Sequence, residues 1–302
     1  MRVDPYYVSN LVGSLDQTQS TLQQLTSELS SGVRVTSLSQ DPVASGENVL
    51  LLNQMQQDDT FTQNSSLVTG QLQVADSALG SVVSQLTQAI SLATSANNGT
   101  MNANDVKSIG SQISGILGEV QSLANTNYQG QFIFAGGQTS TLPFSTSNAT
   151  SPAVTTYSGD EDINYLLTPN GQKIQLNVPG DQIFAGAGAN GVFTALNNLV
   201  ADYSSGTVNA AQAASDTQAL TTALNYVSQQ RVTIDNSITQ VSASSSAVSN
   251  EQTQLTSAQT NLMQADVAKI STQLSLSETQ QTALEDVISQ LGSGSLFDKL
   301  PG

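Results

Sequence analysis

The sequence contains no cysteine, histidine or tryptophan. Without Cys and His, the chain cannot form a Ser-His-Asp or Cys-His nucleophile system, a Cys/His zinc or haem site, or a disulfide framework. It carries seven Lys and Arg residues against 23 Asp and Glu residues, which gives a formal net charge of −16. The seven cations are scattered singly, so no basic patch is available to neutralise phosphates. We therefore expect neither nucleic acid nor an anionic membrane as a partner.

Aromatic residues and long apolar runs are also scarce. Aromatics make up only 5% of the 302 residues, so burial must come from Leu, Val, Ile and Ala along thin interfaces, which suits long helices better than a deep enzyme pocket. Apolar runs are no longer than four residues, as in Val49 to Leu52, whereas a transmembrane helix needs roughly 20 residues. The first five residues open no apolar stretch typical of a cleavable secretory signal. We expect export, if any, by a route without such a signal.

What is abundant is uncharged polarity with a heptad rhythm. Ser, Thr, Gln and Asn together supply 129 residues. Apolar residues near the start are spaced alternately by three and four, with Thr18 as one polar substitution, which predicts a helix with a single apolar seam. The seam stops at Ser31-Gly32, and Asp41-Pro42 marks the start of the next helix. The apolar members of this first seam are Val8, Leu11, Leu15, Leu22, Leu25 and Leu29.

The same rhythm predicts two further helices before residue 128. The first runs from Pro42 to about Asn97 and ends at a Gly/Asn turn, Asn97 to Gly99. The second runs through Val106 to Leu123 and ends at Asn125 to Asn127. Because the turn between them is short, we expect an antiparallel helical pair.

The character of the sequence changes near residue 129. Residues 131–134, 155–157, 163–167 and 173–178 have the β-branched and aromatic content of short strands, and Asn170-Gly171 is a strong hairpin turn signal. Four of the seven prolines fall between residues 143 and 179. The sequence therefore predicts a small β-rich insertion.

Helical rhythm returns at Val192, breaks at Ser204 to Gly206, and then continues to the C-terminal region. The last seam has Ile270, Leu274, Leu284, Ile288 and Leu291 as its apolar members. We predict a mainly α fold, a long heptad-rich bundle in which the N- and C-terminal helices pair. The predicted domains are residues 1–42 with 258–302 (terminal coiled coil), 43–138 with 192–257 (inner bundle), and 139–191 (outer β-rich insertion).

Several motifs resemble the flagellin family. Residues 29–37, Leu-Ser-Ser-Gly-Val-Arg-Val-Thr-Ser, followed by Asp-Pro-Val-Ala-Ser-Gly at 41–46, resemble the N-terminal signature of that family. Further similarity to the members that join hook and filament lies in residues 1–3, 130–136, 178–184, 192–199, 265–268 and 295–297. The sequence departs from these members at Gly136-Gly137, where they have Gly followed by an aromatic residue.

The resemblance implies a structural function without catalysis. It implies a homo-oligomeric ring between hook and filament, formed by packing of terminal helices between subunits, with the first hook-associated protein on the hook side and flagellin on the filament side. It further implies an extracellular place in the bacterial flagellum, type III export without a cleaved signal peptide, and an export chaperone at the C-terminal helix.

The candidate site is accordingly an assembly surface. We expect no catalytic, cofactor-binding or metal-binding residues and no cofactor. The candidate assembly residues are the apolar members of the two terminal seams together with Arg34, which is either a surface charge or a hydrogen-bonded residue between domains or subunits. A heptad stripe is often intramolecular core, and the intramolecular and assembly roles can coexist.

Three alternatives remain open. The chain could be a filament-forming flagellin with a small outer domain. Asp160-Glu161-Asp162 echoes a calcium loop, but that loop needs Gly at its sixth position and Glu at its twelfth, where this chain has Tyr165 and Gly171, so a solvated turn is favoured. A hydrolase using Asp160, Glu161 or Asp181 has no motif behind it.

Overall fold

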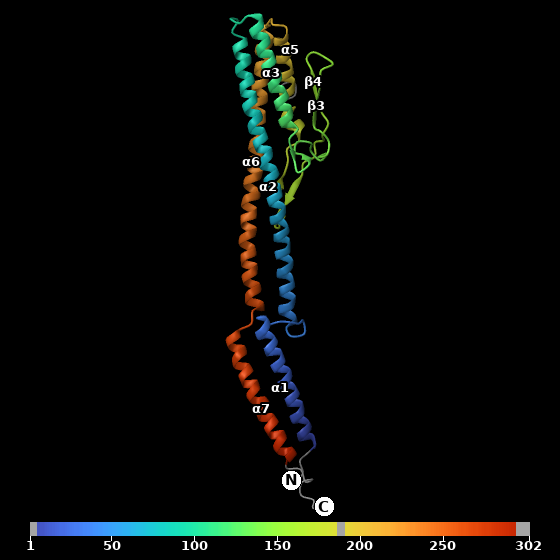
Figure 1. The fold of residues 1–302 in the computed structure, drawn as a ribbon, viewed down its shortest axis with the longest axis vertical. Helices are drawn as coiled ribbons and strands as arrows, with labels where there is room; N and C mark the ends of the chain where they lie inside the picture. The colour runs from blue at the N-terminus through green and yellow to red at the C-terminus, as the bar shows by residue number, and fades with distance from the viewer. Residues whose placement is uncertain (1–4, 186–190, 294–302) are drawn as a thin grey trace, which may run out of the picture. The chain divides into compact units, whose positions relative to one another are not determined.

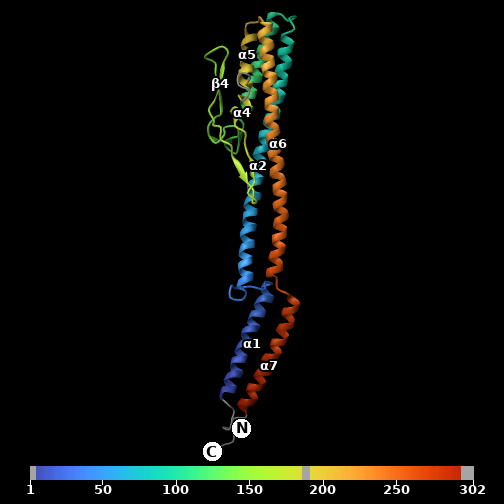
Figure 2. The same cartoon turned by 180° about the vertical axis from the view of Figure 1, so that it is seen from behind.

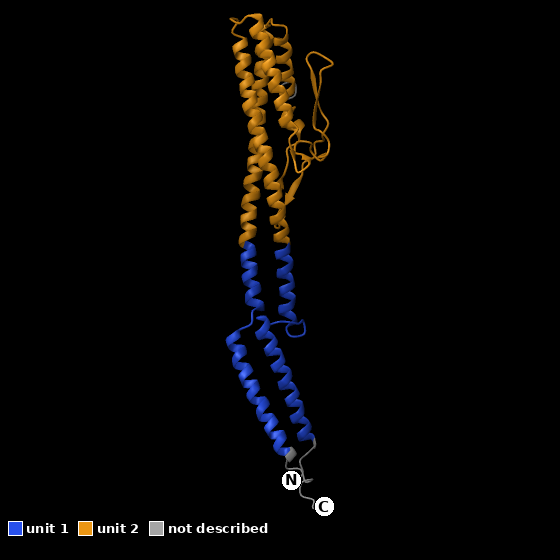
Figure 3. Cartoon of the chain, viewed as in Figure 1, with its two compact units in different colours: residues 1–56, 251–302 blue, residues 57–250 orange. Residues whose placement is uncertain are grey.

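The computed structural model describes residues 5–185 and 191–293, and contacts between residues divide the chain into two units (Figure 3). The first unit combines residues 1–56 with 251–302, and the second holds residues 57–250. The motif residues 1–3 and 295–297 lie outside the described residues. The predicted three-part boundaries at 42, 138, 191 and 257 remain predictions.

The prediction of a mainly α fold is confirmed (Figure 1). The helix bounds match the predicted breaks at Gly32, Asn97, Asn125 and Gly206. The helices are α1 (Pro5–Ser31), α2 (Pro42–Ala96), α3 (Ala103–Ala124), α4 (Gly180–Phe184), α5 (Val192–Ser204), α6 (Ala210–Met263) and α7 (Val267–Ser293).

The β-rich segment consists of three two-stranded antiparallel hairpins. They are β1 (Asn127–Tyr128) with β2 (Gln131–Phe132), β3 (Phe144–Ser147) with β4 (Val154–Tyr157), and β5 (Tyr165–Leu167) with β6 (Lys173–Gln175). The hairpin predicted at Asn170-Gly171 is confirmed, with Gly171 at a positive φ of 82°. The strand predicted over 131–134 is shorter, because Ile133 and Phe134 leave the ladder and are buried in the core.

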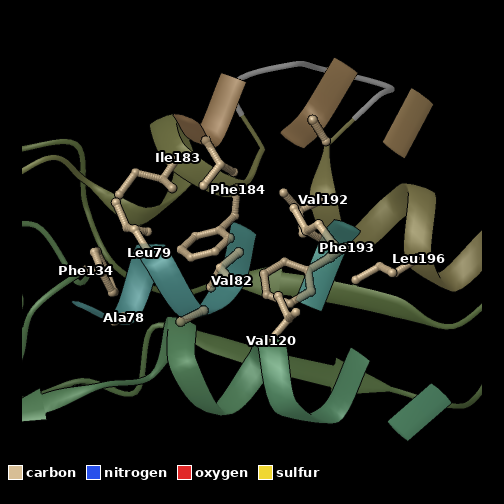
Figure 4. Packing of buried hydrophobic residues seen from close by; sticks show 14 of the residues in the cluster. Ala78, Leu79, Val82, Val120, Phe134, Ile183, Phe184, Val192, Phe193 and Leu196 are labelled. Atoms are coloured by element: carbon tan, nitrogen blue, oxygen red, sulfur yellow. The ribbon is translucent and has the colours of Figure 1, made fainter. Parts of the chain in front are cut away.

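The core of the second unit is one continuous cluster of 38 buried residues, contributed by α2, α3, α5, α6 and the segment between α3 and α5. Figure 4 shows Leu79 and Val82 of α2, Val120 of α3 and Phe193 of α5 directed into the same interior. Seam residues of α6 such as Val227 are fully buried there. The heptad rhythm of the inner helices therefore serves the core of this unit.

Aromatic rings attach the β3–β4 hairpin to the helices. The ring of Phe144 lies 5.0 Å from that of Phe193 and 5.2 Å from that of Phe184, measured between centroids. Asn125, the C-cap of α3, donates from Nδ2 to the Phe144 carbonyl at 2.9 Å and accepts from the Phe144 amide at 2.9 Å. This side chain pairs with β3 as a neighbouring strand would, because its amide offers one donor and one acceptor.

Serine and threonine hydroxyls along the helices are satisfied locally. Thr87 and Thr94 donate to the carbonyls four residues earlier at 2.8 Å, and Thr256 and Ser271 make the same kind of bond. Ser and Thr are ordinarily unfavourable inside helices, because their hydroxyls compete with the backbone for hydrogen-bond partners. A hydroxyl that donates to the carbonyl four residues earlier leaves the helical backbone hydrogen bonds in place. Helices rich in Ser and Thr can therefore remain regular.

In the first unit, α1 and α7 lie side by side and antiparallel in both views (Figures 1 and 2). The predicted pairing of the N- and C-terminal helices is therefore confirmed. Their fully buried apolar cluster consists of Leu25, Ala265 and Ile270, with Leu29 and Leu274 packed beside it. The core of this helical pair is thin compared with that of the second unit.

Candidate assembly surface

The predicted seam residues of α1 and α7 face one another, but few are fully covered. Leu25 and Ile270 are buried, and Val8 is exposed. Two polar residues share the seam: Ser277 is buried, and Gln281 lines the same shallow depression as Leu22. The other predicted members are half-buried: Leu11, Leu15, Leu22, Leu29, Leu274, Leu284, Ile288 and Leu291. The intramolecular pairing therefore uses the seam without covering it.

The two connectors of this unit, residues 32–41 and 264–266, are held together by backbone hydrogen bonds. Val33 and Gln264 form an isolated antiparallel bridge, the Arg34 amide donates to the Met263 carbonyl at 2.7 Å, and the Ala265 amide donates to the Gly32 carbonyl at 3.0 Å. Gly32 has a positive φ of 67°, a conformation that favours glycine after a helix end. The two connectors, residues 32–41 and 264–266, are thus hydrogen-bonded into one structural joint.

Arg34 ties the same joint through its side chain. Its Nη1 forms an ion pair with Asp41 at 3.1 Å, and its Nη2 donates to the Leu262 carbonyl at 3.1 Å. The planar guanidinium directs its two terminal nitrogens to separate acceptors, one carboxylate and one carbonyl. These bonds lie within the first unit of a single chain, so the role between domains or subunits that was left open for Arg34 stays a prediction.

Asp41 serves as the N-cap of α2. Its Oδ1 accepts from the Ala44 amide at 3.0 Å, directly before Pro42 opens the helix. The Ala44 hydrogen bond and then the Arg34 guanidinium lower the pKa of Asp41. The Asp-Pro motif and Arg34 therefore act as one structural element.

Exposed apolar side chains gather on the first unit. Of the 19 large apolar residues that are exposed in the described part of the chain, 12 belong to this unit. They are Tyr6, Tyr7, Val8, Val12, Leu38, Val43, Val49, Leu50, Leu52, Val267, Leu276 and Val287. Exposed apolar surface of this density marks an interaction site more often than scattered single residues do.

An apolar groove lies within this surface. It has a volume of about 610 Å³ and is lined by Glu47, Leu50, Leu51 and Gln54 of α2 and by Ala258, Asn261 and Leu262 of α6. Leu50 is 69% exposed at its edge. Beside it, Gln259 donates from Nε2 to Asn48 Oδ1 at 2.9 Å and ties the two helices together. The groove thus lies between two helices, α2 and α6, that a side-chain hydrogen bond holds together.

Sequence reasoning missed most of these exposed residues, because it selected only the seam positions. One signal was available: successive residues of an α-helix are turned by about 100°, so four apolar residues in a row cannot share one face. In the run from Val49 to Leu52, only Leu51 is half-buried, and the other three are exposed.

The acidic segment 160–162 has irregular backbone and is held by local hydrogen bonds. The Asp160 carboxylate accepts from the Gly137 and Asp162 amides, and Tyr157 donates its hydroxyl to the Asp160 carbonyl at 2.8 Å. A Cβ at Gly136 would collide with the backbone of Asp160, whereas a Cβ at Gly137 would lie 3.1 Å from the Asp160 carboxylate, so the need for glycine is clear only at Gly136. Within residues 5–185 and 191–293, no three Asp or Glu side chains gather so that they could hold a metal ion.

None of the described helices combines the length and apolarity needed to cross a bilayer.

Comparison with known proteins finds a family similarity in the N-terminal part of the chain. Residues 6–139 match the family model described as the bacterial flagellin N-terminal helical region. The chain is 31% identical over 140 residues to flagellar hook-associated protein 3 of Escherichia coli, covering 46% of this chain and 44% of the relative. It is 28% identical over 187 residues to flagellar hook-associated protein 3 of Salmonella typhimurium, covering 62% and 57%. The chain thus spans about half the length of the curated relatives it matches.

Solved structures of flagellar proteins share the fold of this chain. A candidate flagellar hook-associated protein from Vibrio parahaemolyticus superposes with a TM-score of 0.68 at 18% identity, over 74% of this chain and all of that one. Flagellar hook-associated protein 3 from Legionella pneumophila superposes with a TM-score of 0.62 at 12% identity, over 70% of this chain and 98% of that one. At these identities the likeness concerns the fold alone.

Proposed function

We propose that this chain is a structural component of the bacterial flagellum and forms the junction ring between hook and filament. The observation that carries the proposal is the exposed apolar surface of the first unit, which a lone chain leaves in water. The relatives named hook-associated protein 3 support the position at the junction. The proposed partners are further copies of this chain, the first hook-associated protein on the hook side, and flagellin on the filament side.

The proposed mechanism is packing of terminal helices between subunits. The α1–α7 seam is already half-used within the chain, so a neighbouring copy would complete its burial and cover the apolar residues off the seam. Burial of apolar area is the dominant favourable term in such association. The flanks carry few charges, so shape selects the partner. No catalysis is part of this proposal.

The proposal includes how the chain is exported and where it acts. The chain is exported through the flagellar type III channel without a cleaved signal and acts outside the cell, and a chaperone covers its C-terminal helix before export. The lack of cysteine is compatible with passage of an unfolded chain through a channel, because no premature crosslink can form.

Two leucines provide a matched test. Leu50→Asp places a charge in the apolar groove of the first unit, whereas Leu167→Asp changes a leucine on β5 that is 59% exposed, against 69% for Leu50. Each variant replaces the native gene in the source bacterium, and filaments are counted by electron microscopy. We expect Leu50→Asp to leave hooks without filaments and Leu167→Asp to grow filaments. Normal filaments in both variants would refute the assembly surface.

The filament-forming alternative is tested with purified protein. A flagellin polymerises by itself into long filaments, whereas a junction protein that needs its neighbours on both sides does not. Electron microscopy of the concentrated full chain therefore distinguishes the two, and spontaneous long filaments would favour the flagellin alternative.

A further inference from the structure

Two carboxyl groups meet where α5 is followed by α6 in the second unit. Asp202 lies near the end of α5, and Asp216 lies in the second turn of α6. Asn198, one turn before Asp202, donates from Nδ2 to Asp216 Oδ1 at 3.3 Å, and Gln212 donates from Nε2 to Asp216 Oδ2 at 2.9 Å. Asp216 is only 6% exposed. Each of its two oxygens therefore accepts one hydrogen bond from a side-chain amide.

Asp202 has the opposite environment. Its Oδ2 is buried, and no hydrogen-bond donor of the described residues reaches it. A buried carboxylate oxygen without a donor is costly, because its hydration is lost without replacement. A protonated carboxyl removes the problem, since its O–H can itself donate to the neighbouring carboxylate.

We propose that Asp202 is protonated in the folded protein and donates a hydrogen bond to Asp216, so that one shared proton fastens the end of α5 to the start of α6. The two groups belong to different helices and are joined by the Asn198 bridge, so the proton acts between elements. Two neighbouring carboxylates that interact as Asp202 and Asp216 do repel each other when both are ionised.

The surrounding charges leave this repulsion uncompensated. On α5 the only charged residue is Asp202, and β4 and the end of α2 that meets Tyr203 carry no charge. The nearest cation of α3, Lys107, lines a depression with Val200 and Ser204, on the opposite flank of α5. Burial, the hydrogen bond to Asp216 and the negative charge of Asp216 together raise the pKa of Asp202 to about 6.

The direction of the pH dependence follows from this pKa. Because the pKa in the folded chain lies above the unfolded value, the folded state keeps a proton that the unfolded chain has already released. The stabilisation is complete below about pH 4, falls as the pH rises towards 6, and is absent above it.

The fastening affects more than the two helices. Asn197 of α5 donates to Thr155 of β4 at 3.3 Å, and Phe193 of α5 packs on Phe144 of β3. When the pair is doubly ionised, the end of α5 loosens, and the β3–β4 hairpin loses part of its support. The proton thus controls how firmly the β-rich segment is held.

The test compares Asp202→Asn with Glu119→Gln, an exposed carboxyl on α3, in the full chain. Unfolding is followed by circular dichroism at pH 4.5 and 7.5, and hydrogen exchange reports on residues 192–216. We expect Asp202→Asn to abolish a pH-dependent change of up to about a hundredfold in the opening equilibrium of this region, because a tenfold change accompanies each unit of pKa shift. Glu119→Gln should keep the wild-type pH dependence.

The protonation itself is read from the carboxyl ¹³C shift of Asp202 by NMR. We expect a midpoint near pH 6 that falls towards 4 in Asp216→Asn. A wild-type midpoint near 4, or unchanged pH dependence in Asp202→Asn, would overturn the proposal. Stabilisation of the wild type by millimolar Ca²⁺ at pH 7.5, lost in Asp202→Asn, would also overturn it, because the pair would then hold a cation in place of the proton.

Discussion

The thin core of the α1–α7 pair makes one leucine decisive. Leu25 is 7% exposed and packs in a cluster with only two other buried apolar residues, Ala265 and Ile270. Leu25→Ala removes buried methyl groups and leaves a cavity, which costs about 3 kcal/mol at a well-buried site. Because no second buried cluster supports this pair within the described residues, the whole cost falls on the opening of α1 and α7.

The assay is hydrogen exchange on the full chain, which resolves α1 and α7 from α3. A loss of about 3 kcal/mol corresponds to roughly a hundredfold lower protection of amides in α1 and α7, down to the limit set by unfolded helices. Amides of α3 should not change, because its core in the second unit is separate. The matched control is Leu276→Ala on α7, where the leucine is 59% exposed and truncation costs at most about 0.5 kcal/mol.

Two outcomes would refute the reasoning. Unchanged protection of α1 and α7 in Leu25→Ala would mean that the cluster does not hold the pair. Equal losses in Leu25→Ala and Leu276→Ala would mean that burial within the chain does not rank these leucines. A loss in assembly with Leu276→Ala, at unchanged stability, would agree with its place on the exposed surface.

Further predictions concern the seam, the joint and the β3 anchor. Leu22→Asp or Leu284→Asp should block junction assembly while leaving the second unit helical by circular dichroism; normal filament growth would count against the terminal seam. Arg34→Lys should open the joint nearly as much as Arg34→Ala, because the single ammonium nitrogen of lysine does not reproduce the spacing of the two guanidinium nitrogens that bind Asp41 and the Leu262 carbonyl, and limited proteolysis within residues 35–40 measures this opening. Asn125→Ala should lower the stability of the second unit by about 2 kcal/mol, since it strands the Phe144 amide and carbonyl; chemical denaturation measures the loss, and a change below about 0.5 kcal/mol would contradict it.

Local chemistry explains why most helix ends could be predicted from the sequence. Gly32 supplies the positive φ at the end of α1, Asp41-Pro42 supplies the cap and first turn of α2, and Asn102 caps α3 through hydrogen bonds to two backbone amides. Each of these signals acts within four residues. Such features need no knowledge of the rest of the fold.

The position of the break between α6 and α7 was not predicted from the heptad pattern, although the seam shifts by one residue across it: Leu255 and Ile270 lie 15 residues apart, one more than two heptads. The cause is partly long-range: Gln264 bridges to Val33, and the Ala265 amide reaches the Gly32 carbonyl. One local signal was present, since Asp266 Oδ1 accepts from the Lys269 amide as an N-cap does. A tertiary contact decided where the helix stops, and the cap residue then fixed the new start.

The candidate site was predictable only in part, for a related reason. Heptad spacing locates the faces that two helices turn towards each other, and Leu25 and Ile270 do meet. It does not reveal residues such as Leu50 or Leu276, which lie off the seam and become conspicuous only when their exposure is known. The heptad periodicity predicts the helix face that pairs, but it does not predict an exposed apolar face on the other side of the helix.

The hydroxyl back-bonds along the helices bear on the desolvation cost of assembly. A serine or threonine that donates to the carbonyl four residues earlier has no free O–H to satisfy elsewhere, as Thr18, Thr26 and Thr272 illustrate on α1 and α7. When a neighbour covers such a helix, water can leave without stranding a donor, and the threonine methyl groups add to the apolar contact. A surface rich in hydroxyls can therefore be buried in many registers at low desolvation cost.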